Sequence, residues 1–331
     1  MFEEGYRRRR VIGAALALPA LALTGKAARA AEDFPNRAVT LVVSGPAGGT
    51  TDYTARLISQ RLSDRLGVPV VVENRAGGNG MLALQAVIRA KPDGHTLLIG
   101  YSGTITGKPA VEGFGDFDPR RDLASVALIL QAPQVMMVHP TIPVGSLSEF
   151  IAYAKARPGE LNYASSGSGS LQHLGTELLK QRAGIDMVHV PYRGTGETMK
   201  DVLAGRIQFY MTTPPPVAVA IRDGRLRALA MAAAERHPAL PEVPTAAEAG
   251  LPGYAAESWF GLFAPKAASG AIVSRLAADC REILADPSLQ QRALDAGALV
   301  SFEDPPTLDR RVATELDMWT KLVKDAGIRP D

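Results

Sequence analysis

The chain has 331 residues, of which 46% are hydrophobic and 21% charged, and it contains 32 glycines, 24 prolines and one cysteine. This length allows two domains with full hydrophobic cores, and the composition excludes disordered and collagen-like proteins. Because Cys280 stands alone, no internal disulfide can form, and its helical surroundings indicate a small buried side chain. The five histidines lack metal-ligand spacing and no dinucleotide-binding glycine motif follows a strand, so we predict no metal and no cofactor.

The first 30 residues have the pattern of a targeting segment. Basic residues Arg7 to Arg10 precede an apolar run from Val11 to Leu23, which is short for a membrane span, and Ala28-Arg29-Ala30 has the pattern of a cleavage site. We therefore predict a signal peptide over residues 1–30, cleaved near Ala31, and a periplasmic protein exported by the general or the twin-arginine route. The alternative is an uncleaved membrane anchor.

Removal of this segment changes the net charge of the protein. Six of the 36 basic and two of the 34 acidic residues lie in residues 1–30, so the remaining chain carries 30 basic and 32 acidic residues and a net charge of −2. A basic surface for nucleic acid is therefore not expected. No later segment is long and apolar enough to predict a membrane span.

In chain order, the first folded unit is a strand, a glycine-rich loop and a helix. An apolar run over residues 39–43 predicts the strand, and a helical pattern from Asp52 to Leu66 follows, with Gly67 as the expected C-cap. The loop over residues 46–52 should place free N–H groups and the positive end of the helix dipole together, which predicts an anion site. The alternative is a tight loop that binds nothing. The candidate residues of this loop are Ala47, Gly48, Gly49, Thr51 and Asp52, the last of which can also simply stabilise its own helix start.

The same unit recurs along the chain. A second copy has a strand over residues 68–72, a loop over 74–80 and a helix through Ile88, and a further strand over 96–99 leads to the candidate residue Ser102. Strands that alternate with helices predict a parallel sheet covered by helices. Residues 103–122 show no clear pattern.

The third and fourth copies are the richest in hydroxyl groups. The third has a strand over residues 161–164 and a helix from Leu171, and the fourth a strand over 187–190 and a helix through Leu203. One helix cap needs only one serine, so the surplus hydroxyls of the third loop favour a binding site over simple capping. A strand over 207–211 then leads to Thr213. The candidates here are Ser165, Ser166, Gly167, Ser168, Ser170, His173, Tyr192, Arg193, Gly194 and Thr213.

Two apolar runs predict that the chain crosses between domains twice. Residues 126–138, broken by Pro133, should leave the first domain, and residues 259–264 should return to it. We therefore predict a discontinuous lobe 1 over residues 31–132 and 258–331, and a lobe 2 over residues 133–257. Within these lobes the sequence also predicts a helix opened by a capping box at 146–149, a strand over 226–231, and helices over 270–285, 287–297 and 307–326.

Groups for catalysis are scarce. His173 lies near the serine-rich loop, which suggests a Ser–His hydrolase, but the G-x-S-x-G spacing is absent and no third member follows. We predict no catalytic residues and a protein that binds a small anion rather than transforming it. Two alternatives stay open, namely a secreted hydrolase and a sensor module for a membrane signalling protein.

These motifs together resemble one known family. The matching segments are Phe34-Pro35-Asn36-Arg37, residues 46–52, Val71-Val72-Glu73-Asn74-Arg75, Pro92-Asp93-Gly94-His95-Thr96-Leu97, Pro158-Gly159-Glu160-Leu161-Asn162-Tyr163, residues 165–174 and His189-Val190-Pro191-Tyr192-Arg193-Gly194. In this order they cover nearly all of the chain after residue 30. The chain resembles the periplasmic substrate-binding receptors of tripartite tricarboxylate transporters, also called Bug receptors.

The resemblance implies a fold, a ligand class and partners. The fold would be the two-lobed α/β fold of type II periplasmic binding proteins, a Venus flytrap in which each lobe is a mainly parallel sheet flanked by helices. A small carboxylate would bind between the lobes, on the 46–52 and 165–170 loops, residues 192–194 and Thr213. The partners would be membrane permease subunits, and we expect a monomer. Family members often carry Phe-Asp-Asn where this chain has residues 209–213, and the missing Asp argues against an amino-acid-like ligand.

Overall fold

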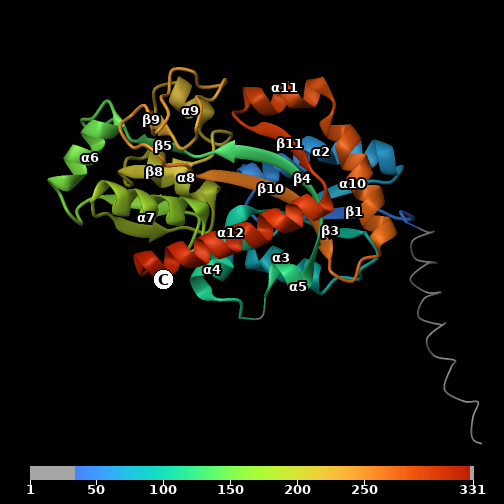
Figure 1. Cartoon of the computed structure of the whole chain (residues 1–331). Helices are drawn as coiled ribbons and strands as arrows, with labels where there is room; N and C mark the ends of the chain where they lie inside the picture. The colour runs from blue at the N-terminus through green and yellow to red at the C-terminus, as the bar shows by residue number, and fades with distance from the viewer. Residues whose placement is uncertain (1–33, 116, 329–331) are drawn as a thin grey trace, which may run out of the picture.

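The computed structural model describes residues 34–115 and 117–328, so the predicted signal peptide over residues 1–30 lies outside the described residues. The chain forms two α/β lobes that lie side by side (Figure 1). We call the part built on a six-stranded sheet lobe 1 and the part built on a five-stranded sheet lobe 2. The predicted α/β class with helices on both faces of each sheet is confirmed.

Lobe 1 has the strand order β11-β4-β10-β3-β1-β2. The strands are β1 (Val39–Val43), β2 (Val70–Asn74), β3 (Thr96–Tyr101), β4 (Leu123–Pro133), β10 (Glu257–Pro265) and β11 (Leu299–Glu303). β1 pairs in parallel with β2 and β3, whereas β10 runs antiparallel to both β3 and β4. The sheet is therefore mixed rather than mainly parallel, because β10 enters it from lobe 2 in the opposite direction, and β11 also runs antiparallel to β4.

Helices cover both faces of this sheet. They are α2 (Thr50–Leu66), η1 (Gly78–Gly80), α3 (Met81–Ile88), η2 (Gly103–Gly107), α4 (Lys108–Glu112), α5 (Pro119–Asp122), α10 (Gly270–Leu284), α11 (Pro287–Asp295) and α12 (Pro305–Ala326). Leu62 of α2 and Leu276 of α10 share one core, while Leu84 of α3 and Leu308 of α12 lie in the core on the other face. α2 ends at Gly67, whose φ of 70° confirms the predicted C-cap.

Lobe 2 has the strand order β7-β6-β8-β5-β9 and is also mixed. Its elements are β5 (Val135–Val138), α6 (Leu147–Lys155), β6 (Asn162–Ser165), α7 (Leu171–Ala183), β7 (Val188–Pro191), α8 (Thr195–Leu203), β8 (Phe209–Thr212), α9 (Ala218–Arg222) and β9 (Arg227–Met231). β6 is parallel to β7 and β8, and β5 is antiparallel to β8 and β9. The predicted cap of α6 is confirmed, since Ser146 accepts a hydrogen bond from the amide of Glu149.

The two sheets are joined by neighbouring strands. Gln134 is the one residue between β4 of lobe 1 and β5 of lobe 2, and its amide donates to the carbonyl of Ala256 at 2.9 Å. Ala256 directly precedes β10, in which Ser258 pairs with Ala132 of β4. The outgoing and returning segments therefore lie side by side where the chain passes between the lobes.

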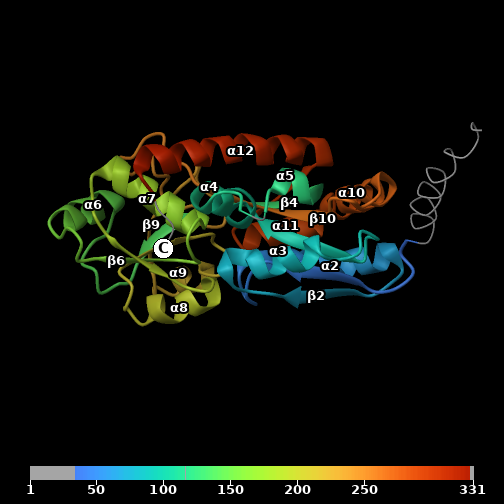
Figure 2. The ribbon, with the colours of Figure 1, turned by 90° about the horizontal axis from the view of Figure 1, so that it is seen from below.

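The last helix, α12, extends along both lobes (Figure 2). Its Trp319, which is 7% exposed, shares a hydrophobic cluster with Val111 of α4 and with Leu171 and Leu174 of α7. α12 thus connects lobe 1 to lobe 2 by side-chain packing as well as by the chain itself. Across residues 34–115 and 117–328, no helix combines the length and the apolar character that a membrane span requires.

Candidate functional site

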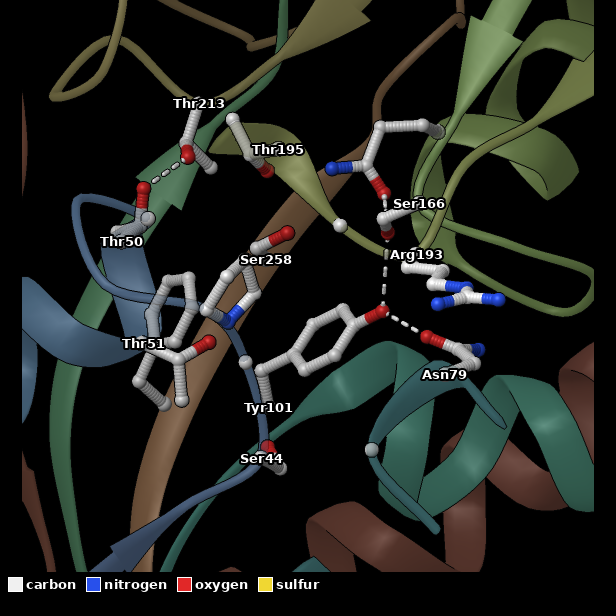
Figure 3. Close-up of a pocket in the computed structure, with 17 residues that line it drawn as sticks. Ser44, Thr50, Thr51, Asn79, Tyr101, Ser166, Arg193, Thr195, Thr213 and Ser258 are labelled. Atoms are coloured by element: carbon white, nitrogen blue, oxygen red, sulfur yellow. Dashed lines mark hydrogen bonds between the residues drawn. The ribbon is translucent and has the colours of Figure 1, made fainter. Parts of the chain in front are cut away.

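A small cavity lies between the lobes, where loops that follow several strands meet the first turns of the helices (Figure 3). Its volume is about 40 Å³. Lobe 1 contributes Ser44, Gly45, Pro46, Gly49, Thr50, Thr51, Asn79, Gly80, Tyr101, Ser258 and Phe260. Lobe 2 contributes Ser166, Gln172, Arg193, Gly194, Thr195 and Thr213. The lining is made mainly of hydroxyl, amide and glycine residues.

Three helices begin at this cavity with a glycine as N-cap. Gly49, Gly80 and Gly194 precede α2, α3 and α8, and none of these helices has a side-chain cap. The first amides of such helices are available to an acceptor, and the helix dipoles favour negative charge there. Gly194 has a φ of 148°, and a Cβ atom built on it would lie 2.5 Å from the Pro46 ring. The close approach of the two loops therefore requires glycine at this position.

One end of the cavity is formed by Tyr101, Asn79, Ser166 and Arg193 (Figure 3). The Tyr101 hydroxyl donates to Asn79 Oδ1 and lies 3.4 Å from Ser166 Oγ. Burial raises the pKa of Tyr101 to about 12, so its phenol stays protonated at neutral pH. Arg193 is exposed, and it is the one charged side chain among the residues that line the cavity.

The other end carries hydroxyl groups from both lobes. Thr50 of α2 and Thr213, which follows β8, share a hydrogen bond of 2.6 Å between their hydroxyl oxygens. Ser44 lies beside Gly80 rather than at this end; it is buried, and its hydroxyl has no partner among the described residues. No carboxylate lines the cavity, so its side chains offer neutral hydrogen-bonding groups and one positive charge. Such a lining can surround a small anion without repelling it.

Six predicted site residues line this cavity, and the other ten do not. Those that line it are Gly49, Thr51, Ser166, Arg193, Gly194 and Thr213. Those outside the lining are Ala47, Gly48, Asp52, Ser102, Ser165, Gly167, Ser168, Ser170, His173 and Tyr192.

Asp52 lies outside the cavity lining and stabilises the loop over residues 46–52 through hydrogen bonds. Its carboxylate accepts the amide of Gly48 at 3.0 Å and the guanidinium Nε of Arg56 at 3.0 Å. Burial by itself would raise the pKa of Asp52, but the hydrogen bonds from Arg56, Gly48 and Asn74 outweigh it, so the pKa lies below its ordinary value. Asp52 therefore acts on the shape of the loop, with its charge balanced by Arg56.

The serines of the 165–170 loop have separate roles. Ser170 is the N-cap of α7 and accepts the amide of His173, whose ring Nδ1 in turn accepts the amide of Gly169. Ser166 alone among them reaches the cavity, where it donates to Gln172 Oε1 at 3.1 Å. Ser165 Oγ lies 2.6 Å from Nε2 of His189, and neither residue lines the cavity. Of the four serines in this loop, only Ser166 therefore lines the cavity.

Several lining residues were not predicted as site residues. Asn79 and Gly80 lie in the second strand–loop–helix unit, which the pattern identified, and Thr195 directly follows Gly194. If the loops of all four strand–loop–helix units had been treated alike, Asn79, Gly80 and Thr195 would have been predicted as site residues. Ser258 and Phe260 belong to β10, and their sequence surroundings show only an apolar strand. Among residues 34–115 and 117–328, no cluster of ligands suited to a metal ion is found.

Comparison with known proteins identifies the family of the chain. A family model described as the tripartite tricarboxylate transporter family receptor matches residues 54–328. A protein encoded in the tcbD–tcbE intergenic region of Pseudomonas sp. (strain P51) is 37% identical over 322 residues, which cover 96% of this chain and 94% of that protein.

Solved structures of similar proteins include complexes with carboxylates. R. palustris Rpa4515 with adipate has a TM-score of 0.86 at 37% identity, covering 90% of this chain and 100% of that one. MatC from Rhodopseudomonas palustris with bound malate has a TM-score of 0.82 at 36% identity, covering 88% and 100%. The periplasmic binding protein BugD has a TM-score of 0.84 at 30% identity, covering 90% and 100%. Since the family model covers most of the chain and these structures share its two-lobed fold, the chain belongs to the tripartite tricarboxylate transporter receptor family.

Proposed function

We propose that this protein is a periplasmic receptor that captures a small carboxylate between its lobes and delivers it to the membrane subunits of a tripartite transporter. The observation that carries the proposal is the charge of the cavity lining, which includes Arg193 and no carboxylate. The uncapped starts of α2, α3 and α8 add donors and positive dipole ends to the same space. The similar proteins solved with adipate and malate support a carboxylate as the ligand.

Binding would require the lobes to separate and close again. The cavity of about 40 Å³ holds only a few water molecules, at roughly 10–15 Å³ each. Contacts such as the Thr50–Thr213 hydrogen bond cross between the lobes and would break on opening. We propose a hinge motion about Gln134 and Ala256, where the chain passes between the sheets, and a ligand that favours the closed state.

A hydrolase is the second candidate, because Ser165 and His189 form a Ser–His pair at 2.6 Å. Ser165 is 0% exposed and lies outside the cavity lining, so a substrate in the cavity would not reach its hydroxyl. A nucleophile must lie within reach of the bound substrate. The geometry therefore favours a receptor, and turnover of carboxylic esters by the purified protein would contradict this.

The test is calorimetric titration with a panel of mono- and dicarboxylates, neutral sugars and inorganic phosphate. We expect binding of at least one carboxylate and none of the sugars. Arg193→Gln should weaken carboxylate binding, because the variant removes the cavity's positive charge. Arg225→Gln is the matched control, since Arg225 is also an exposed arginine of lobe 2 but lies outside the cavity lining.

Two outcomes would contradict the proposal. Binding of sugars without carboxylates would contradict the ligand class, and equal loss of affinity in both arginine variants would remove the role of Arg193. Delivery needs a separate measurement, namely uptake of the bound carboxylate by vesicles that contain the transporter's membrane subunits. Uptake that is independent of added receptor would favour a sensor module instead.

A further inference from the structure

Gln134 combines an unusual position with an unusual side-chain environment. It is the single residue between β4 and β5, and its backbone amide and carbonyl are hydrogen-bonded to Ala256 and Ala232. The side chain is 0% exposed, and its Nε2 donates to the hydroxyl oxygen of Ser258 at 2.7 Å. This bond therefore links the two segments that connect the lobes.

The other half of the Gln134 amide is unsatisfied. Its Oε1 atom is buried and has no hydrogen-bond partner among the described residues. An unpaired buried acceptor reduces the stability of a folded protein, so it offsets the stabilisation from the hydrogen bond between Nε2 and Ser258. The stability of the fold alone therefore does not explain a glutamine at this position, which indicates a functional role.

The partner of Gln134 faces the ligand cavity. Ser258 is 2% exposed and lines the cavity, with its hydroxyl pointing into it (Figure 3). Because the Ser258 oxygen accepts from Gln134, its own hydrogen remains available, and it has no acceptor among the described residues. A carboxylate in the cavity would supply that acceptor.

We infer that Gln134 is a positioning residue that orients the Ser258 hydroxyl as a donor to the bound carboxylate, and that this contact couples ligand binding to the hinge. The inference rests on the proposed receptor function. The pair Gln134–Ser258 spans both connecting segments, so a ligand held by Ser258 contacts the hinge itself as well as the two lobes. Ligand binding that depends on the closed hinge geometry shifts the population toward the closed state.

The test is a double-mutant cycle with Gln134→Met and Ser258→Ala. Methionine has nearly the same size as glutamine and no hydrogen-bonding amide. The probe is adipate or malate, whichever binds the unmodified protein more tightly by titration calorimetry. We expect Ser258→Ala to weaken binding by roughly ten- to a hundredfold, as for loss of one hydrogen bond to a charged group. We expect Gln134→Met to weaken it by about two- to tenfold, and to have no further effect when Ser258 is already alanine.

Melting temperatures and small-angle scattering distinguish a positioning role of Gln134 from a structural one. Gln134→Met should leave the melting temperature of the ligand-free protein nearly unchanged, because it removes the unsatisfied Oε1 together with the hydrogen bond to Ser258. Thr176→Val is the matched control, since Thr176 of α7 is also fully buried, has a hydroxyl without a partner in the described part of the chain and lies outside the cavity. That variant should raise the melting temperature without changing affinity. Small-angle scattering at saturating ligand should show full compaction of the unmodified protein and smaller compaction of Ser258→Ala.

The possible failures are distinguishable. If the unmodified protein binds no carboxylate, both the proposed function and this inference are overturned. If it binds and Gln134→Met leaves the affinity unchanged, or weakens it equally with and without Ser258, only the inference is overturned. Full compaction of Ser258→Ala at saturation would likewise overturn the coupling to the hinge.

Discussion

Thr50 and Thr213 form a hydrogen bond of 2.6 Å between their hydroxyl oxygens, although they are 163 positions apart and belong to different lobes. Both side chains are buried, at 6% and 4% exposed. The bond can exist only while the lobes are in contact at this point. In the proposed hinge motion it would therefore stabilise the closed state and not the open one.

We expect Thr50→Val and Thr213→Val each to weaken carboxylate binding by roughly 0.5–1.5 kcal/mol, because valine keeps the shape and removes the bond. The double variant should lose little more than either single one, since both remove the same interaction. Titration calorimetry of the three variants measures this. Fully additive losses would show that the two hydroxyls act separately, for example on the ligand.

The serine-rich loop allows a direct comparison of capping and binding. Ser170→Ala should cost roughly 1 kcal/mol in the free energy of unfolding without ligand, because Ser170 caps α7. Ser166→Ala should weaken carboxylate binding by about 1–3 kcal/mol if its hydroxyl turns to the ligand.

Ser168 provides the control within the same loop. Its hydroxyl is buried without a partner among the described residues and lies outside the cavity lining, so Ser168→Ala should leave affinity unchanged and should not reduce stability. Urea unfolding and calorimetry of the three variants provide both quantities. Equal effects of all three substitutions would contradict the separate roles.

Asp52 should make the stability of the protein depend on pH. Its folded-state pKa lies below the ordinary value of 3.8, so it stabilises the fold above about pH 4 and loses this effect as the pH falls through the folded-state pKa. Asp52→Asn should therefore cost roughly 1 kcal/mol near pH 7, and the difference from the unmodified protein should shrink in acid. Urea unfolding as a function of pH tests this, and a difference that grows on acidification would contradict it.

Cys280 should report global unfolding. The thiol is 1% exposed, and burial together with the nearby Asp279 raises its pKa to about 12. A buried neutral thiol is a poor nucleophile, so a thiol reagent should not label the native protein at pH 8. In concentrated guanidinium chloride the same reagent should modify one thiol per chain. Rapid labelling under native conditions would mean that α10 opens locally.

Local patterns predicted most of the elements but only part of the site. Strand β1, the helix end at Gly67 and the cap at Ser146 depend on nearby residues, so the sequence alone was sufficient. Strand β11 and the short α9 were missed, because their patterns are too weak without the surfaces that they cover.

The residues that line the cavity also fall into two groups, those that local sequence predicts and those that it does not. Gly49 and Gly194 were predicted because they follow strands and precede helices within short segments. Ser258 and Tyr101 could not be predicted, because the side of the strand that faces the other lobe is decided by the packing of both sheets. The prediction of mainly parallel sheets was wrong for a related reason. The direction of β10 depends on the point at which the chain leaves lobe 2 and re-enters lobe 1.

The place of β10 in the sheet has a consequence for the order of folding. β10 lies between β3 and β4, yet it is synthesised after the whole of lobe 2. Until residues 257–265 are available, β3 and β4 lack the partner that they share, and open strand edges tend to pair with other chains. A chain that ends at residue 256 should therefore aggregate, whereas one that ends at 304, which keeps every strand of the sheet, should be more soluble when both are refolded by dilution. Completion of the lobe 1 sheet is thus a late event in the synthesis of the chain, later than completion of the lobe 2 sheet, whose strands all precede residue 257.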